Sequence, residues 1–252
     1  MNPDKIHLSY LKEIHCGRKR GIHLEITTKC LLKCPLCLRV SHPNMMKEAK
    51  ATYGEMTIED FKKIVSFGWS AITMCGNFSD PIYHSEFLKF LEIIELSEKI
   101  NTAVIHTNGW GRKISWWEKA YKFTKIKWIF GLDGLPHQSH IYRRNQKGEE
   151  VWEVMKLGSK MGRKIIWQWI PFGYNEDFIE EGLQMAKDNN IEFLLRPSTR
   201  FYDPQENGRK IFYKNKGSVD DEYWDLLKPK SIFINKVGGS NKERIWLNTI
   251  NK

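Results

Sequence analysis

Apolar residues follow two different periods along most of this chain. Short segments rich in β-branched and aromatic residues predict strands, and the longer stretches between them carry apolar residues at helical spacing. Strands that alternate with helices in this way pair in parallel through right-handed crossovers. The predicted strands are residues 22–27, 71–75, 102–106, 127–132, 164–170 and 191–195.

The predicted helices carry boundary signals of their own. The segments Thr57 to Asp60 and Ser115 to Glu118 have the spacing of a capping box, in which the first side chain caps the helix. Gly162 is suited to end another helix, because glycine adopts the left-handed backbone conformation at little cost. The predicted helices are residues 57–67, 87–94, a segment starting at 115, and residues 149–161 and 178–188.

This alternation favours an α/β protein of one main domain. Six strand-helix units favour an open, partial (β/α)6 barrel of the TIM type over a closed eight-stranded barrel, and a doubly wound sheet is an alternative. After residue 200 the alternation stops, and a helix over residues 219–227 followed by a hairpin around Gly238 and Gly239 is predicted. We therefore divide the chain into an N-terminal lead-in (1–21), the partial barrel (22–200) and a C-terminal extension (201–252).

Composition narrows the class of protein further. Of the 252 residues, 41% are hydrophobic and 28% are charged, which excludes an intrinsically disordered chain. No apolar run approaches the roughly 18 residues of a membrane span, and the N-terminus lacks an apolar signal core, so a soluble, cytoplasmic protein is expected. With 40 Lys and Arg against 30 Asp and Glu, the net charge of +10 favours anionic partners.

The cysteines indicate a metal site. Cys30, Cys34 and Cys37 lie within eight residues, directly after the first predicted strand. In parallel α/β folds the loops after the strands build the active site. Thiolates so close together can hold a soft metal centre, and a cubane iron–sulfur cluster with three cysteine ligands keeps one iron open. A structural zinc site with His42 as the fourth ligand is an alternative.

The C-x3-C-x2-C spacing, with the apolar Leu36 just before the last cysteine, resembles the signature of the radical S-adenosylmethionine (SAM) superfamily. The resemblance implies that Cys30, Cys34 and Cys37 hold a [4Fe-4S] cluster. It also implies that the open iron of the cluster chelates the amino and carboxylate groups of SAM. The resemblance extends over about residues 22–200, which is the predicted partial barrel itself.

Polar segments at the ends of the following strands extend the resemblance. In Cys75-Gly-Asn-Phe-Ser-Asp-Pro81, the acidic residue is similar to that of the GGEP-type motif, which meets the amino group of SAM. His106-Thr-Asn-Gly109 is similar to the family's TNG segment. Gly131-Leu-Asp-Gly134 is similar to its S-x-D-G segment, whose aspartate is suited to accept hydrogen bonds from ribose hydroxyls. The residues implied to bind the cofactor are Leu36, Gly76, Asn77, Ser79, Asp80, Thr107, Asn108, Asp133, Gln168 and Arg196.

Three other conspicuous residues are expected to be structural. Cys75 ends an apolar strand and is expected to be a small buried hydrophobic residue. Trp167 and Trp169 alternate with Gln168, so both indoles are expected to point to the same side of a strand and to pack there.

By the same resemblance, the chain is an enzyme. A one-electron donor such as flavodoxin or ferredoxin would reduce the cluster, and SAM would be cleaved to methionine and a 5'-deoxyadenosyl radical that abstracts hydrogen from a substrate. The chain looks like the core of SPASM or Twitch relatives without their auxiliary-cluster cysteines, because no cysteine follows Cys75. A peptide or a small anionic metabolite is the favoured substrate. RNA or nucleotide modification and a non-catalytic zinc-binding interaction module are the alternatives, and no catalytic side chain is assigned.

Overall fold

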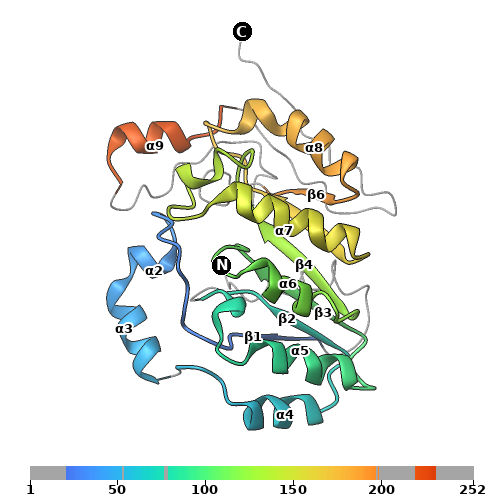
Figure 1. Ribbon diagram of the computed structural model, residues 1–252. Coiled ribbons are helices and arrows are strands. Elements are labelled where there is room, and N and C mark those ends of the chain that lie inside the picture. The colour runs from blue at the N-terminus through green and yellow to red at the C-terminus, as the bar shows by residue number, and fades with distance from the viewer. Residues whose placement is uncertain (1–20, 53, 77–78, 197, 199–218, 231–252) are drawn as a thin grey trace.

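Six parallel strands form one sheet, in which neighbours in space are also neighbours in sequence. The structure is a computed structural model, and it describes residues 21–52, 54–76, 79–196, 198 and 219–230. Within these residues the strand order is β1-β2-β3-β4-β5-β6, and no pairing joins β6 back to β1 (Figure 1). The strands are β1 (Gly21–Leu24), β2 (Ala71–Met74), β3 (Thr102–Thr107), β4 (Ile126–Gly131), β5 (Lys164–Trp169) and β6 (Glu192–Leu195).

The open six-stranded sheet confirms the predicted partial barrel. All six predicted strands are present, with one clear difference at the first of them. That strand was expected to reach residue 27, but β1 ends at Leu24. Beyond it the chain leaves the sheet and pairs with a different segment, since the Met56 amide donates to the carbonyl of Ile26 at 2.9 Å and Thr27 forms an antiparallel bridge with Glu55.

The helices that connect successive strands lie on one face of the sheet, towards the viewer in Figure 1. Two further helices follow the cysteine segment, and another lies near residue 220. The connecting helices are α4 (Ile58–Ser66), α5 (Phe87–Leu96), α6 (Ile114–Ala120), α7 (Gly148–Lys160) and α8 (Ile179–Asp188). The others are α2 (Leu38–Ser41), α3 (Pro43–Thr52) and α9 (Asp221–Leu227), with short 3-10 turns at Pro81–Tyr83, Ser139–Ile141 and Glu176–Phe178.

The two predicted capping boxes have different outcomes. Thr57 caps α4 as expected, because its hydroxyl oxygen accepts a hydrogen bond from the Asp60 amide at 3.0 Å. The prediction for Ser115 was wrong: α6 begins one residue earlier, and Lys113 precedes it without a side-chain cap. Trp117 is fully buried, so we attribute the position of this helix to the packing of its indole rather than to a cap.

The two faces of the sheet carry different kinds of residue. The outer face packs against the helices through a large aromatic core that includes Trp128, Trp167 and Trp169, all fully buried, which confirms that the last two indoles pack. The inner face has a small apolar layer with one residue from each of four strands: Val104, Ile129, Ile166 and Leu194. Side chains alternate along a strand, so the inner-face residues two positions further on lie nearer the carboxyl ends.

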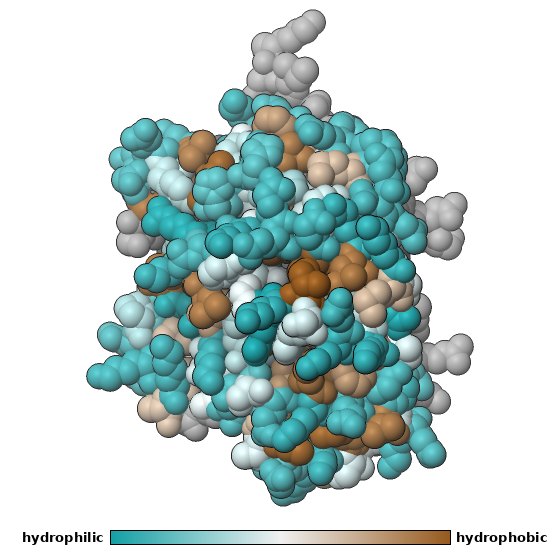
Figure 2. All heavy atoms as spheres, viewed as in Figure 1, coloured by the Kyte–Doolittle hydropathy of each residue, from teal (hydrophilic) through white to brown (hydrophobic). Residues whose placement is uncertain are grey.

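The surface of the molecule, its helices and its C-terminal part bear on the remaining predictions. On the face that Figure 2 shows, hydrophilic residues predominate and hydrophobic ones form scattered patches. None of the helices in the described residues is long and apolar enough to cross a membrane. The predicted helix over residues 219–227 is present as α9, and the predicted hairpin around Gly238 and Gly239 lies outside the described residues.

Candidate functional site

The three clustered cysteines line one cavity of about 200 Å³ at the carboxyl ends of the strands. Most of the cavity wall comes from the residues that follow β1, β2, β3 and β4, and its floor continues the inner apolar layer of the sheet. The lining residues are Cys30, Leu32, Cys34, Cys37, Arg39, Cys75, Gly76, Ser79, Asp80, His106, Thr107, Asn108, Ile129, Gly131, Arg143 and Gln168. The topology therefore brings together segments that are far apart in the sequence.

A tight turn holds the cysteine segment over the cavity. The Cys37 amide donates to the Cys34 carbonyl at 3.0 Å, and α2 starts directly after Cys37. Arg39, the second residue of α2, donates to the Thr28 carbonyl at 2.7 Å and thereby ties the helix back to the segment that leaves β1. Leu36 is buried in the main core and does not line the cavity, so its place here is a packing one.

The thiols of Cys30, Cys34 and Cys37 form no disulfide. Burial raises the pKa of Cys30 to about 12, and the nearby Asp80 carboxylate adds to this effect. Burial also raises the pKa of Cys34 to about 11, against the opposing charge of Arg143. A bound metal ion supplies the positive charge that such thiols lack and displaces their protons. Among the described residues, no three His, Cys, Asp or Glu side chains are arranged to hold a single metal ion.

Asp80 is a buried carboxylate that has only uncharged hydrogen-bond donors. One of its oxygens accepts from the Ile82 amide at 3.2 Å. The other accepts from the Thr107 hydroxyl at 3.1 Å and from both the backbone and side-chain nitrogens of Asn108 at 2.6 Å. Burial raises the pKa of Asp80 to about 6. No described Lys, Arg or His forms an ion pair with it.

Asn108 connects this carboxylate to the cysteines. Its side-chain nitrogen, which donates to Asp80, also lies 3.7 Å from the sulfur of Cys30. Its side-chain oxygen accepts from the Tyr83 hydroxyl at 3.0 Å and from the Trp110 amide at 3.0 Å, which fixes the amide orientation. The structure thus places Asp80, Thr107 and Asn108 together, beside Cys30, as the sequence order of strand ends suggested.

Gly76 and Ser79 border the same cavity. A Cβ atom on Gly76 would lie 1.7 Å from the carbonyl oxygen of Ser79, so only glycine fits this turn. The hydroxyl of Ser79 donates to Glu25 at 3.0 Å. Asn77, which was predicted to be a cofactor contact, lies outside the described residues.

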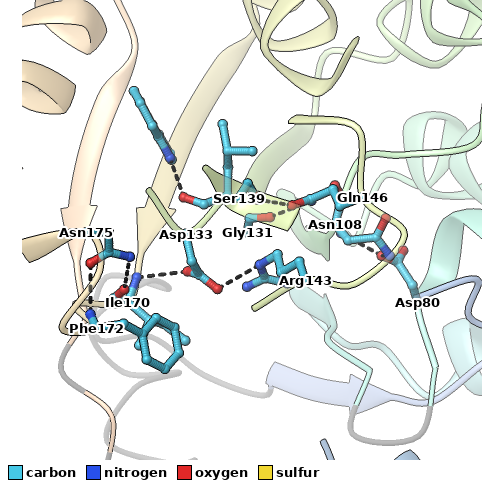
Figure 3. Close-up of polar contacts among 12 residues, drawn as sticks. Asp80, Asn108, Gly131, Asp133, Ser139, Arg143, Gln146, Ile170, Phe172 and Asn175 are labelled. Atoms are coloured by element: carbon cyan, nitrogen blue, oxygen red, sulfur yellow. Dashed lines mark hydrogen bonds and ion pairs between the residues drawn. The ribbon is translucent and has the colours of Figure 1, made fainter. Parts of the chain in front are cut away.

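Asp133 is fully buried and already has strong partners (Figure 3). One oxygen accepts from Nε of Arg143 at 2.8 Å, and the other accepts from the Ile170 amide at 2.9 Å. The residue does not line the cavity, whereas Arg143 does. Contact between Asp133 and ribose hydroxyls therefore stays a prediction, and the structure gives this carboxylate the separate task of holding Arg143.

Gly131 leaves the room that Arg143 occupies. A Cβ atom at residue 131 would come within 2.4 Å of the guanidinium, so the glycine found where serine is frequent has a spatial reason. Gln146, fully buried, donates to the carbonyls of Asn108 at 2.7 Å and Gly131 at 3.0 Å, and accepts from the Ser139 hydroxyl (Figure 3). This side chain ties the end of β3 to the end of β4.

Sequence reasoning missed several residues at or beside the cavity. Cys75 was expected to be a small buried hydrophobic residue, yet it lines the same cavity as the other three cysteines, and burial raises its pKa to about 12. Arg143 and His106 also line the cavity, and Gln146 braces it from behind. The inner-face position of His106, two residues after Val104, is the signal that could have identified it.

Of the two remaining predicted cofactor contacts, one lines the cavity and the other does not. Gln168 lines the cavity, two residues beyond Ile166 on the inner face of β5. Arg196 does not line it, although its charge acts on Cys75, and its backbone amide donates to the Trp169 carbonyl at 2.8 Å. A second, larger cavity of about 660 Å³ lies between residues 25–28, α3 and α4, and none of the predicted site residues lines it.

Comparison with known proteins gives fold-level similarity. No protein-family model matches the chain, and no curated protein matches it. Among solved structures, SuiB from Streptococcus suis aligns over 90% of this chain with a TM-score of 0.61 and 17% identity. This chain has the fold of SuiB. SuiB bound to S-adenosylmethionine aligns over 90% (TM-score 0.53, 16% identity), and SuiB bound to precursor peptide SuiA over 84% (TM-score 0.53, 17% identity).

The similarity covers only part of SuiB. The chain spans 46% to 47% of the length of the SuiB structures, slightly less than half.

Proposed function

We propose that this chain is a radical SAM enzyme that binds a [4Fe-4S] cluster and SAM and acts on a peptide. The observation that carries the proposal is the composition of one cavity, in which Cys30, Cys34 and Cys37 lie together with the carboxylate of Asp80, which has no ion pair with any described residue. When bound, the cluster and SAM would supply an electron transfer that splits SAM into methionine and a 5'-deoxyadenosyl radical, which takes hydrogen from the substrate.

The donor set is suited to an iron–sulfur cluster. A [4Fe-4S] cluster takes one thiolate per iron, so three cysteines would hold three of its irons and leave one open. Cys30 and Cys34 have raised pKa values because of burial, and the positive charge of a cluster's irons would favour their thiolate forms. Asn108 would donate a hydrogen bond towards the sulfur of Cys30, a type of contact that tunes cluster potentials.

The polar ends of the cavity are complementary to an amino acid. Asp80 has no cationic partner among the described residues and would accept hydrogen bonds from an amino group. Arg143 uses only Nε in its pair with Asp133, so its two terminal nitrogens can donate to a carboxylate in the bidentate geometry that guanidinium groups favour. Gln168 adds a further hydrogen-bonding side chain to the same wall.

The chain also shields this chemistry from water. The apolar layer formed by Val104, Ile129, Ile166 and Leu194 closes the cavity from below, and these residues are almost fully buried. Exclusion of water protects a reactive intermediate from side reactions. The flanking aromatic core keeps the strand ends, and therefore the site residues, in fixed positions.

A peptide is the substrate class that we favour. Support comes from the structure of SuiB with precursor peptide SuiA, which shares the fold of this chain. The net charge of +10 is compatible with an acidic peptide, and also with a small anionic metabolite or RNA. Salt-sensitive binding of RNA would favour the RNA alternative over a peptide. Flavodoxin or ferredoxin is proposed as the electron donor.

The deciding experiment is anaerobic reconstitution of the cluster, followed by dithionite reduction with SAM and chromatography for 5'-deoxyadenosine. We expect formation of 5'-deoxyadenosine by the wild-type protein and its loss, together with the cluster, in Cys34→Ala. Cys75→Ala is the matched control, because Cys75 lines the same cavity but lies outside the three-cysteine motif, and this variant should still bind the cluster. A colourless protein with about one zinc per chain and no SAM cleavage would instead support the zinc-binding module.

A further inference from the structure

The cysteine segment has an outer side that is apolar and exposed. The side chains of Leu31, Leu38 and Val40 flank the three cysteines in sequence, and these residues are 50%, 41% and 40% exposed. Single exposed leucines are ordinary on protein surfaces. Three large apolar residues within ten positions, on the segment that carries the candidate metal ligands, point instead to a surface that contacts another molecule.

One of these three residues, Val40, lines a groove of about 510 Å³, which we call the Lys33 groove. Its lining residues are Lys33, Pro35, Val40, Arg144, Asn145, Val219 and Asp220. Two hydrogen bonds fix its walls to each other: the Lys33 amide donates to the Arg144 carbonyl at 3.1 Å, and the Asn145 side chain donates to the Leu31 carbonyl at 3.3 Å. The Lys33 groove therefore has a defined shape that does not depend on a ligand.

The charge of this side is positive. No Asp or Glu occurs from Ile26 to Lys47, a stretch that contains three lysines and one arginine. Lys33 and Arg144 are both exposed, and neither forms an ion pair with another described residue. The acid in the groove lining, Asp220, uses a carboxylate oxygen to cap α9 by accepting from the Tyr223 amide at 2.7 Å.

The Lys33 groove and the cysteine cavity are lined by alternate residues of one short segment. Lys33 and Pro35 line the groove, and Cys34 between them lines the cavity. The two hollows share no lining residue, so a molecule in the Lys33 groove would leave the cavity open.

We propose that the Lys33 groove docks a small acidic electron-carrier protein of the flavodoxin class. This inference rests on the proposed function, since the carrier in its hydroquinone form would pass one electron to the cluster and become a semiquinone, without transfer of any other group. Transient redox interfaces are small, with an apolar centre and a charged rim, and the lining of the Lys33 groove likewise combines Pro35, Val40 and Val219 with the charges of Lys33 and Arg144. The opposite charges would steer the two proteins together.

The test compares two reductants on the cluster-loaded protein. Stopped-flow absorbance follows cluster reduction by flavodoxin hydroquinone and, separately, by photoreduced deazaflavin, a small reductant that needs no docking surface. In Lys33→Glu/Arg144→Glu we expect the second-order rate with flavodoxin to fall at least about tenfold, while the rate with deazaflavin stays unchanged. Lys62→Glu, an exposed charge reversal on α4, is the matched control and should retain both rates.

Each outcome separates the two proposals. A wild-type rate of flavodoxin reduction in Lys33→Glu/Arg144→Glu would overturn the docking site, even if deazaflavin-driven SAM cleavage proceeds. Failure of the wild-type protein to cleave SAM with deazaflavin would instead overturn the proposed function. Loss of RNA binding in the double variant, with flavodoxin reduction unchanged, would assign the Lys33 groove to RNA. Lys33→Ala/Arg144→Ala should show a smaller fall in the same direction, and added salt should slow the wild-type reaction more than that of either double variant.

Discussion

Two buried aspartates, Asp80 after β2 and Asp133 after β4, differ in whether a cationic side chain is paired with them. Asp80 accepts hydrogen bonds from four uncharged donors, on Ile82, Thr107 and Asn108, and has no ion pair among the described residues. Asp133 is paired with the guanidinium of Arg143 at 2.8 Å. Both carboxylates are almost completely buried, at 4% and 0% exposure, so burial does not explain the difference.

The difference indicates which aspartate is available to a ligand. Uncharged donors stabilise a carboxylate only in part, and burial leaves the pKa of Asp80 at about 6. A ligand with an amino group would supply the missing partner. The charge of Asp133 is already balanced by Arg143, and nearby negative groups raise the pKa of Arg143 further. This ion pair is therefore part of the protein's internal structure. We therefore propose that Asp80 and Arg143 bind the ligand and that Asp133 positions Arg143.

The largest effect on stability should follow from breaking the ion pair between Asp133 and Arg143. Asp133→Ala would leave the guanidinium of Arg143 buried without its partner, and we expect a loss of about 3 to 5 kcal/mol in the free energy of unfolding. Urea denaturation followed by circular dichroism measures this loss. Asp133→Asn should lose less, because an amide oxygen can still accept from Nε. A loss below about 1 kcal/mol for Asp133→Ala would show that Asp133 does not hold Arg143.

A smaller effect is expected at Gly131. An alanine Cβ there would lie 2.4 Å from the guanidinium, so Gly131→Ala should displace Arg143 and cost about 1 to 3 kcal/mol of stability. It should also weaken SAM binding, measured by equilibrium dialysis with the cluster-loaded protein. Gly162→Ala is the control: it has backbone strain at φ +71° but open space around it, so it should lower stability without changing SAM affinity.

The sequence was sufficient for the fold because the strands and helices carry strong local patterns. Each strand of the sheet is a compact apolar segment, and parallel pairing follows from the intervening helices. The features of the fold that the sequence did not predict depend on tertiary packing. The start of α6 coincides with burial of Trp117, and α3, with its mixed pattern of apolar and charged residues, gave no clear period. The end of β1 depends on pairing with residues near Glu55.

For the site, the strand ends were predictable and the loops were not. Cys30, Asp80 and Asn108 follow successive strands, so parallel topology alone brings them to one edge of the sheet. Arg143 lies in a long loop after β4, and no sequence rule states that this loop folds back over Gly131. Gly131 occupies the serine position of the family's S-x-D-G segment, and nothing in the sequence explains the glycine. The structure shows that it makes room for a guanidinium, which a single sequence could not reveal.

The next test addresses the proposed role of Asp80 directly. Asp80→Asn keeps the shape of the side chain but removes its charge, and we expect the cluster to be retained while SAM affinity falls about tenfold, equivalent to about 1.4 kcal/mol. Equilibrium dialysis at neutral pH measures the affinity, and iron content measures the cluster. Asp177→Asn is the matched control, because it neutralises an exposed carboxylate that neither lines the cavity nor contacts a residue that does. Unchanged SAM affinity in Asp80→Asn would contradict the role assigned to Asp80.

The smallest effect should come from pH alone. Because the pKa of Asp80 is about 6, its carboxylate is almost fully ionised at pH 7.5 and mostly protonated at pH 5.5. The protonated form cannot accept from an amino group at both oxygens, so SAM affinity should be lost as the pH falls through about 6. The amino group of SAM also titrates, so the useful quantity is the ratio of wild-type to Asp80→Asn affinity, in which that contribution cancels. We expect this ratio to shrink about fourfold between pH 7.5 and 5.5. A ratio that stays constant across this range would mean that the ionised form of Asp80 makes no contact with the ligand, and the distinction between the two aspartates would fail.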